Sequence, residues 1–188
     1  MNIKTNATTV EPLGSSVDQG QTGLEVAVQF AIEELDSEEP PSSKSITVWA
    51  QAAFAAHSGV TGDADSGKRK ATEVTIRLVD KSEMTELNHV YRGKSGTTNV
   101  LSFPAELPPE LIEELEMGLL GDIVICHSVV IQEAKLQQKT VADHYAHMVT
   151  HGVLHLCGYD HEDDVSASQM EGLEIKVLAV NDINNPYR

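Results

Sequence analysis

Apolar and polar residues alternate in several short stretches of the chain, a pattern typical of strands that bury one face. The clearest stretch begins at Leu24 and places Val26, Val28 and Phe30 on the same side. The strands predicted in this way cover residues 24–32, 72–79, 97–103 and 119–126. Pro104 is expected to stop the third strand, because proline cannot donate a hydrogen bond to a neighbouring strand.

Elsewhere the apolar residues follow the three- to four-residue spacing of an amphipathic helix. The helices predicted in this way cover residues 46–57, 82–91, 128–139, 141–156 and 163–180. Ser82 is expected to cap the second helix, and Thr140 with Asp143 has the spacing of a capping box at the start of the fourth. The core residues expected on the last helix are Met170, Leu173, Val177 and Val180.

Strands and helices are mixed along the chain, and helices dominate its C-terminal half. This order predicts a single α+β domain over residues 23–188, with a small mixed sheet of about four strands packed by helices. Residues 1–22 are rich in Thr, Ser, Gly and Gln, with little to bury, so we expect a flexible N-terminal tail. Residues 36–45 and 58–71 are expected to be loops.

Charge at first argues against a nucleic-acid partner. The chain has 13 basic and 29 acidic residues, a net charge of −16, whereas phosphate contacts rest on Lys and Arg. However, seven of the 13 basic residues lie between Lys68 and Lys94, which leaves room for a basic groove on an acidic body. A solvated surface with scattered basic residues explains the charge equally well.

The cysteine count and the apolar runs bear on the compartment. The two cysteines, Cys126 and Cys157, are far apart, which argues against a disulfide framework or a cysteine-based zinc site. The N-terminus lacks the apolar core of a signal peptide, and no apolar run is long enough to cross a bilayer. We therefore expect a reduced, cytoplasmic protein with no membrane partner.

The segment from Thr140 to His161 holds a group of histidines with metal-binding spacing. His151 and His155 are four residues apart on the predicted helix, so they are neighbours on one face. Gly158 is a natural stop for this helix, and the chain can then reverse and return His161 as a third ligand. Three histidines leave a fourth position of zinc open for water, which is the arrangement of catalytic sites.

Other residues in this segment leave alternatives open. The helix also contains His144 and His147, so a ligand pair one turn earlier, His147 with His151, is possible. Cys157 can in principle coordinate a soft metal, but a buried, apolar-like thiol is the favoured interpretation. The acidic residues at 162–164 are expected to favour the N-terminus of the next helix.

The spacing of the three histidines equals that of the metzincin proteases. The glutamate that follows the first histidine in zincin proteases is the general base there, and Gly152 stands at that position here. The pattern therefore indicates a metal site but does not support peptidase chemistry.

The run from His151 to His161, His-Gly-Val-Leu-His-Leu-Cys-Gly-Tyr-Asp-His, resembles the signature of the YbeY family of bacterial endoribonucleases, which act as rRNA maturation factors. Two further blocks also resemble that family: residues 91–94 followed by 98–104, and residues 120–126. The similarity covers roughly Leu24 to the C-terminus. Departures from the expected pattern are Cys157, Thr97 and a long segment at 58–71.

The resemblance implies a zinc-dependent endoribonuclease specific for single-stranded RNA, with one ion per chain. Its expected tasks are small-subunit rRNA maturation at the 3′ end, ribosome biogenesis and ribosome quality control, with the ribosome or its small subunit as partner. The resemblance also implies that His151, His155 and His161 are the metal ligands and that Arg92 is functionally important. Arg92 is expected to bind a phosphate oxygen and stabilise the transition state, and Lys94 to add a point charge.

Two other functions stay open on the sequence. One is a metzincin-like zinc peptidase. The other is a non-catalytic ribosome-assembly factor in which the metal only stabilises the fold. For Arg92 itself, the alternative to a catalytic role is an ordinary surface ion pair.

Overall fold

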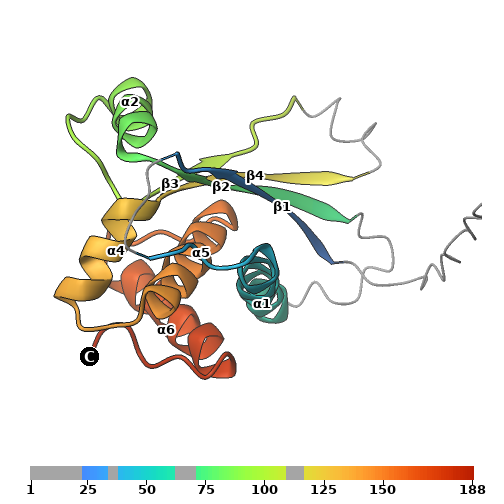
Figure 1. The fold of residues 1–188 in the computed structure, drawn as a ribbon. Coiled ribbons are helices and arrows are strands. Elements are labelled where there is room, and N and C mark those ends of the chain that lie inside the picture. Colours follow the sequence, from blue (N-terminus) through green and yellow to red (C-terminus); the bar gives the residue numbers. More distant parts are fainter. Residues whose placement is uncertain (1–22, 34–37, 62–70, 109–116) are drawn as a thin grey trace, which may run out of the picture.

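Four strands form one mixed sheet in the order β1-β2-β4-β3 (Figure 1). The computed structural model describes residues 23–33, 38–61, 71–108 and 117–188. The strands are β1 (Leu24–Ala31), β2 (Thr72–Val79), β3 (Val100–Pro104) and β4 (Gly118–Cys126). The pairs β1–β2 and β2–β4 are parallel, and β3 is antiparallel to β4. The predicted mixed sheet is therefore confirmed.

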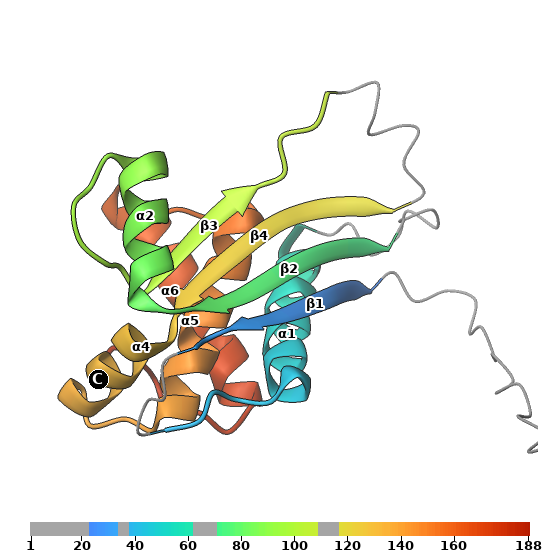
Figure 2. The same ribbon diagram turned by 45° about the horizontal axis from the view of Figure 1, so that its top comes forward.

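The helices divide unequally between the two faces of the sheet. They are α1 (Ser43–Thr61), α2 (Lys81–Arg92), α4 (His127–Leu136), α5 (Val141–Leu156) and α6 (Asp164–Val180). Figures 1 and 2 show α1, α4, α5 and α6 on one face and α2 alone on the other. Among the described residues, no helix is both long and apolar enough to cross a membrane.

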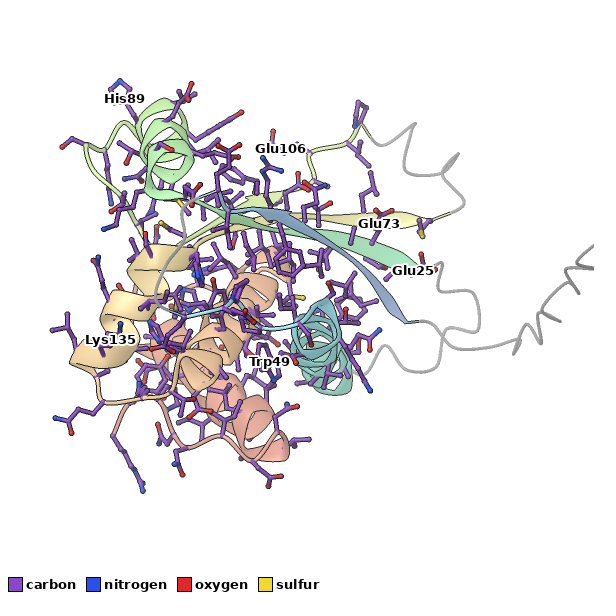
Figure 3. All side chains as sticks on the ribbon, viewed as in Figure 1. Glu25, Trp49, Glu73, His89, Glu106 and Lys135 are labelled. Atoms are coloured by element: carbon purple, nitrogen blue, oxygen red, sulfur yellow. The ribbon has the colours of Figure 1, made fainter. Side chains whose placement is uncertain are left out.

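Helix α5 is the centre of the core, because it touches α1, α4, α6, β3 and β4. Its buried residues include Tyr145, Val149 and Val153, which share one core cluster with Ile123 and Ile125 of β4. Burying a large apolar side chain contributes about 1.5–3 kcal/mol, so many such contacts together fix this helix against the sheet. Side chains fill the layer between the sheet and these helices (Figure 3).

Several predicted ends were wrong for local reasons. Helix α1 begins at Ser43, three residues early, because the Ser42 hydroxyl accepts a hydrogen bond from the Ser45 amide at 3.2 Å. Ser82 is not the cap of α2. Asp80 holds that position, and its carboxylate instead accepts a bond from the Glu33 amide at 2.8 Å.

The end of α4, the place of Pro104 and the exposure of Val180 also differ in detail from the prediction. Helix α4 ends at Leu136 rather than 139, since Gln138 has a positive φ of 56°. Strand β3 does end at Pro104, but it includes this residue, which pairs with Gly121 as an edge strand tolerates. Val180 is 81% exposed and not part of the core.

Some predictions concern residues that the structure does not describe. The predicted tail, residues 1–22, lies outside the described residues, and so do Lys68, Arg69 and Lys70 of the basic stretch. Residues 62–70 of the predicted loop 58–71 are outside them as well, while 58–61 belong to α1.

Gly152 allows α5 to pack closely against the sheet. A Cβ atom at this position would lie 2.9 Å from Cγ2 and 3.0 Å from Cδ1 of Ile123. The position that holds the glutamate in zincin proteases therefore faces β4 in this fold. A larger side chain here would push α5 away from the sheet.

We expect Gly152→Ala to destabilise the fold by about 1–3 kcal/mol, because an overpacked contact outweighs the gain in helix propensity. Gly172→Ala on α6 is the matched control, since a Cβ there meets nothing within 4 Å. That variant should be neutral or stabilising by up to about 1 kcal/mol. Chemical denaturation of both variants checks this, and equal stabilisation of the two would show that α5 has room to move.

Candidate metal centre

The helix that presents the histidines starts and ends as its sequence predicts. The Thr140 hydroxyl accepts a hydrogen bond from the Asp143 amide at 3.0 Å, which caps the first turn of α5. At the other end Gly158 has a φ of 90°, and the Tyr159 amide donates to the Leu154 carbonyl at 3.0 Å. Glycine adopts this conformation without strain, so the chain reverses here and brings His161 back beside α5.

The three predicted histidines come together in this structure. The Nε2 atoms of His151 and His155 are 3.0 Å apart. The centre of the His161 ring lies 5.5 Å from the centre of the His151 ring, and the two rings are nearly parallel. It lies 5.0 Å from the centre of the His155 ring, which is steeply inclined to it. One nitrogen from each ring lies within 4.8 Å of the other two, which is close enough for all three to reach one ion.

The partners of the other ring nitrogens show which nitrogens carry protons. Nδ1 of His151 lies 2.8 Å from a carboxylate oxygen of Glu174, and Nδ1 of His155 lies 3.0 Å from the Tyr159 carbonyl oxygen. Both oxygens only accept hydrogen bonds, so each Nδ1 must donate a proton. In the neutral rings both Nε2 atoms are then bare.

Two bare nitrogens at 3.0 Å cannot form a hydrogen bond with each other. Their lone pairs repel unless a cation lies between them, and imidazole nitrogen is a favoured ligand of zinc and similar ions. The donor set therefore fits a divalent transition metal. The neutral state is also the one that the environment favours. Burial, helped by the nearby His151 and His161, lowers the pKa of His155.

Glu174 of α6 supports the first histidine from behind. Its side chain is fully buried, and its carboxylate receives hydrogen bonds from His151 and from the Tyr187 hydroxyl. Burial alone would raise the pKa of Glu174, but the hydrogen bonds from His147, His151 and Tyr187 outweigh burial and lower that pKa to about 2. A buried, ionised acceptor therefore orients the His151 ring, as carboxylates commonly do behind metal-bound histidines.

The alternative ligand pair, one turn earlier, also has a geometric basis. His147, His151 and Glu174 form a second group in the described residues whose ligand atoms lie within 4.8 Å of one another. This group would use His151 Nδ1, which the Glu174 carboxylate already engages at 2.8 Å. We favour the group of His151, His155 and His161, because there both facing nitrogens are free of protein donors.

His144 has a structural role. It is buried, and its Nε2 lies 2.7 Å from a carboxylate oxygen of Glu133 on α4. Glu133 also accepts hydrogen bonds from the side-chain amide of Asn99, at 3.1 and 3.3 Å. This contact ties α5 to α4 and to Asn99, which lies just before β3 and lines the groove that also contains His151 and His161.

Three other polar residues lie near the histidines, and Cys157 among them is only partly buried. Burial raises the pKa of the Cys157 thiol to about 12, and this thiol belongs to neither candidate metal-binding group among the described residues. Asp163 caps α6 by accepting from the Val165 and Ser166 amides at 2.8 and 3.0 Å. The Asp160 carboxylate accepts from the His161 amide at 2.7 Å and so fixes the turn that carries this histidine.

The cluster lies in an open groove of about 670 Å³ that also contains Arg92. Arg92 is the last residue of α2, and Gly93, with a φ of 63°, ends that helix. The Tyr91 ring packs edge-on against Phe103 of β3, with ring centres 4.9 Å apart, which fixes the end of α2 beside the groove. Lys94 is exposed but is not among the residues that line the groove.

Sequence reasoning overlooked Glu174, Tyr187 and Asn99. A signal existed for Glu174. It lies four residues after Met170 and three before Val177, so the helical period places an acidic residue on the apolar stripe of α6. A buried acid with a displaced pKa is a reasonable marker of a functional site. Tyr187 follows the last helix in an irregular segment, and no periodicity points to it.

Comparison with known proteins gives one consistent result. A family model described as Endoribonuclease YbeY matches residues 32–181. Endoribonuclease YbeY of Alteromonas mediterranea is 47% identical over 164 residues, which is 87% of this chain and 95% of the relative. Endoribonuclease YbeY of Xanthomonas axonopodis pv. citri is 45% identical over 169 residues, 90% of this chain and 96% of the relative.

The solution structure of TM1509 from Thermotoga maritima has a similar fold. It matches with a TM-score of 0.50 and 23% identity, covering 84% of this chain and 92% of that one, so this likeness concerns the fold alone. The family match and the sequence relatives span most of the chain and include the histidine segment. The chain belongs to the endoribonuclease YbeY family.

Proposed function

We propose that this protein is a zinc-dependent endoribonuclease that cleaves single-stranded RNA during maturation of small-subunit rRNA at its 3′ end. Membership of the endoribonuclease YbeY family supports the reaction class and the rRNA role. The observation that carries the proposal is the pair of bare Nε2 atoms of His151 and His155, 3.0 Å apart, in a groove that Arg92 also lines. The ribosome or its small subunit is the proposed partner, and the cytoplasm the proposed compartment.

The three histidines would hold one zinc ion and leave a position for water or substrate. When bound, such an ion supplies Lewis-acid chemistry, because it polarises a phosphoryl oxygen and makes water more acidic. Asp160 keeps the turn of His161 in place, and Glu174 and the Tyr159 carbonyl fix the rings of His151 and His155. These contacts hold the ligands in place before substrate arrives, so the reaction does not have to organise them.

Arg92 is proposed to bind the phosphate group that is cleaved. A guanidinium can contact two phosphate oxygens at once and stabilise the charge that develops on them. Its backbone is anchored by the end of α2 and by the packing of Tyr91 on Phe103. Lys94, outside the groove lining, is proposed to attract the flanking RNA backbone as a point charge.

A local positive charge is necessary because the whole chain carries −16. Arg92 and a divalent cation in the groove would concentrate positive charge where a phosphate must bind, and the acidic surface elsewhere would repel RNA. Among the described residues that line the groove, Asp160 is the single acidic side chain.

The peptidase alternative has little support, because position 152 lies against Ile123 of β4 and offers no general base beside the histidines. The assembly-factor alternative predicts that the metal serves the fold alone. A metal site that opens into a groove beside an exposed arginine is better explained by chemistry on a bound substrate.

The first test measures cleavage of labelled single-stranded RNA by zinc-loaded protein, with a duplex of the same sequence and casein as comparison substrates. We expect cleavage of the single strand and about one zinc per chain. His161→Ala should lose both zinc and cleavage. His89→Ala is the matched control, because His89 is exposed on the outer side of α2 (Figure 3).

Three outcomes of this first test would contradict the proposal. A zinc-loaded protein that leaves RNA intact but keeps its affinity for ribosomes would support the assembly-factor function. Digestion of casein would support the peptidase. Full zinc content in His161→Ala would remove His161 from the ligand set.

The second test concerns Arg92. We expect Arg92→Ala to fold normally, keep its zinc and lose cleavage by about 10²-fold or more, as for one preorganised charge donor. Arg92→Lys should recover only part of the rate, because an ammonium group cannot make the two-pronged contact. Lys176→Ala, an exposed position on α6, removes a positive charge away from the groove and should change little. Near-normal cleavage by folded, zinc-loaded Arg92→Ala would exclude Arg92 from the site.

A further inference from the structure

The C-terminal residues return from the end of α6 to the back of the histidine cluster. The Ile183 amide donates to the Leu178 carbonyl at 3.0 Å, and this bond turns the chain after α6. The Lys139 ammonium then donates to the Pro186 carbonyl at 2.6 Å. The segment is therefore anchored to α6 on one side and to the loop between α4 and α5 on the other.

This anchored segment places Tyr187 beside Glu174. The Tyr187 hydroxyl donates to Oε2 of Glu174, and the Tyr187 ring packs edge-on against His147, with ring centres 5.6 Å apart. Tyr187 is 46% exposed as a residue, but its hydroxyl reaches a carboxylate that is fully buried. The contact is thus specific to the hydroxyl and does not come from burial of the ring.

Glu174 connects Tyr187 to His151, the first histidine of the cluster. Each of its two oxygens accepts a different hydrogen bond. Oε1 accepts from Nδ1 of His151 at 2.8 Å, and Oε2 accepts from the Tyr187 hydroxyl. His147 Nε2 lies farther from Oε2, at 3.5 Å. A buried carboxylate needs donors on both oxygens to stay in one orientation. Among the described residues, removal of the Tyr187 hydroxyl leaves the longer His147 contact alone to hold Oε2.

We infer that Tyr187 and Glu174 are positioning residues of the metal centre, which hold the His151 ring so that its Nε2 faces the ion, and that the C-terminal segment is therefore part of the site. The inference rests on the proposed metal centre. It goes further in assigning a task to residues outside the histidine signature. A ligand that is already oriented binds metal more tightly, because binding does not have to freeze its rotation.

The test is zinc affinity of the full-length protein, measured without RNA by competition with a chromophoric chelator. Tyr187→Phe removes the hydroxyl and keeps the ring against His147, so the fold should be preserved. We expect its zinc dissociation constant to rise by about 10-fold or more, within the range found for lost outer partners of metal ligands. Lys139→Met, which frees the Pro186 carbonyl, should weaken zinc binding in the same direction by a smaller factor.

Tyr145→Phe is the matched control. Tyr145 lies on α5, and its hydroxyl, like that of Tyr187, pairs with a polar side chain: it lies 2.6 Å from Nδ1 of His127. His127 belongs to α4 and not to the histidine cluster. This variant should melt at a lower temperature while its zinc affinity stays within about twofold of the wild type.

The outcomes separate this inference from the proposed function. If the wild-type protein binds zinc and folded Tyr187→Phe binds it equally well, the positioning role is wrong while the metal centre stands. If the wild type itself binds no zinc, the proposed centre fails and this inference fails with it. A dissociation constant that rises as much in Tyr145→Phe as in Tyr187→Phe would show a general loss of stability, and would also overturn the positioning role.

Discussion

The repulsion between two imidazole lone pairs is the constraint on which the site depends. His151 and His155 each use Nδ1 as a donor, to Glu174 and to the Tyr159 carbonyl, so their Nε2 atoms face each other as bare acceptors at 3.0 Å. This arrangement is unfavourable without a cation. The fold maintains it because α5 is fixed by its packing against the sheet and against α1, α4 and α6. Folding energy from burial thus holds two imidazole nitrogens in an arrangement that a bound cation would stabilise.

The same helix explains why the site is accessible. Gly152 allows α5 to lie against Ile123 of β4 on one side, while the histidines point from another side of the helix into the groove. The turn at Gly158 then brings His161 to the rim, where it is exposed. Two histidines on a buried helix and a third on a turn give a candidate metal site that is preorganised and open to the groove.

The sequence predicted the parts of the fold that depend on local interactions. Helix α5 was predicted with its observed bounds, because a Thr140 cap and the Gly158 stop are short-range signals. The order of elements and the mixed sheet followed from hydrophobic periodicity. The start of β3 was missed by three residues, since the side chain of Asn99 accepts a hydrogen bond from the Val100 amide and this contact is invisible to periodicity.

The candidate site shows the same division between local and long-range information. The three histidines lie within eleven residues of each other, and their spacing alone brought them to attention. Glu174 and Tyr187 are 23 and 36 residues beyond His151, and only the packing of α6 and of the C-terminal segment brings them to it. Cys157 follows the last residue of α5, and its side chain packs on the hydrophobic core, which the sequence alone does not show. Partners of this kind follow from tertiary structure and have no signature in a single sequence.

X-ray absorption spectroscopy of the zinc-loaded protein is the most direct test of the central claim that three imidazoles hold the ion and leave one position open. We expect three histidine nitrogens at about 2.0–2.1 Å and one oxygen that exchanges with solvent or with added anions. Sulfur in the coordination shell, or a shell filled by four protein ligands, would contradict it. The first result would assign Cys157 or Cys126 to the metal, and the second would make the site structural.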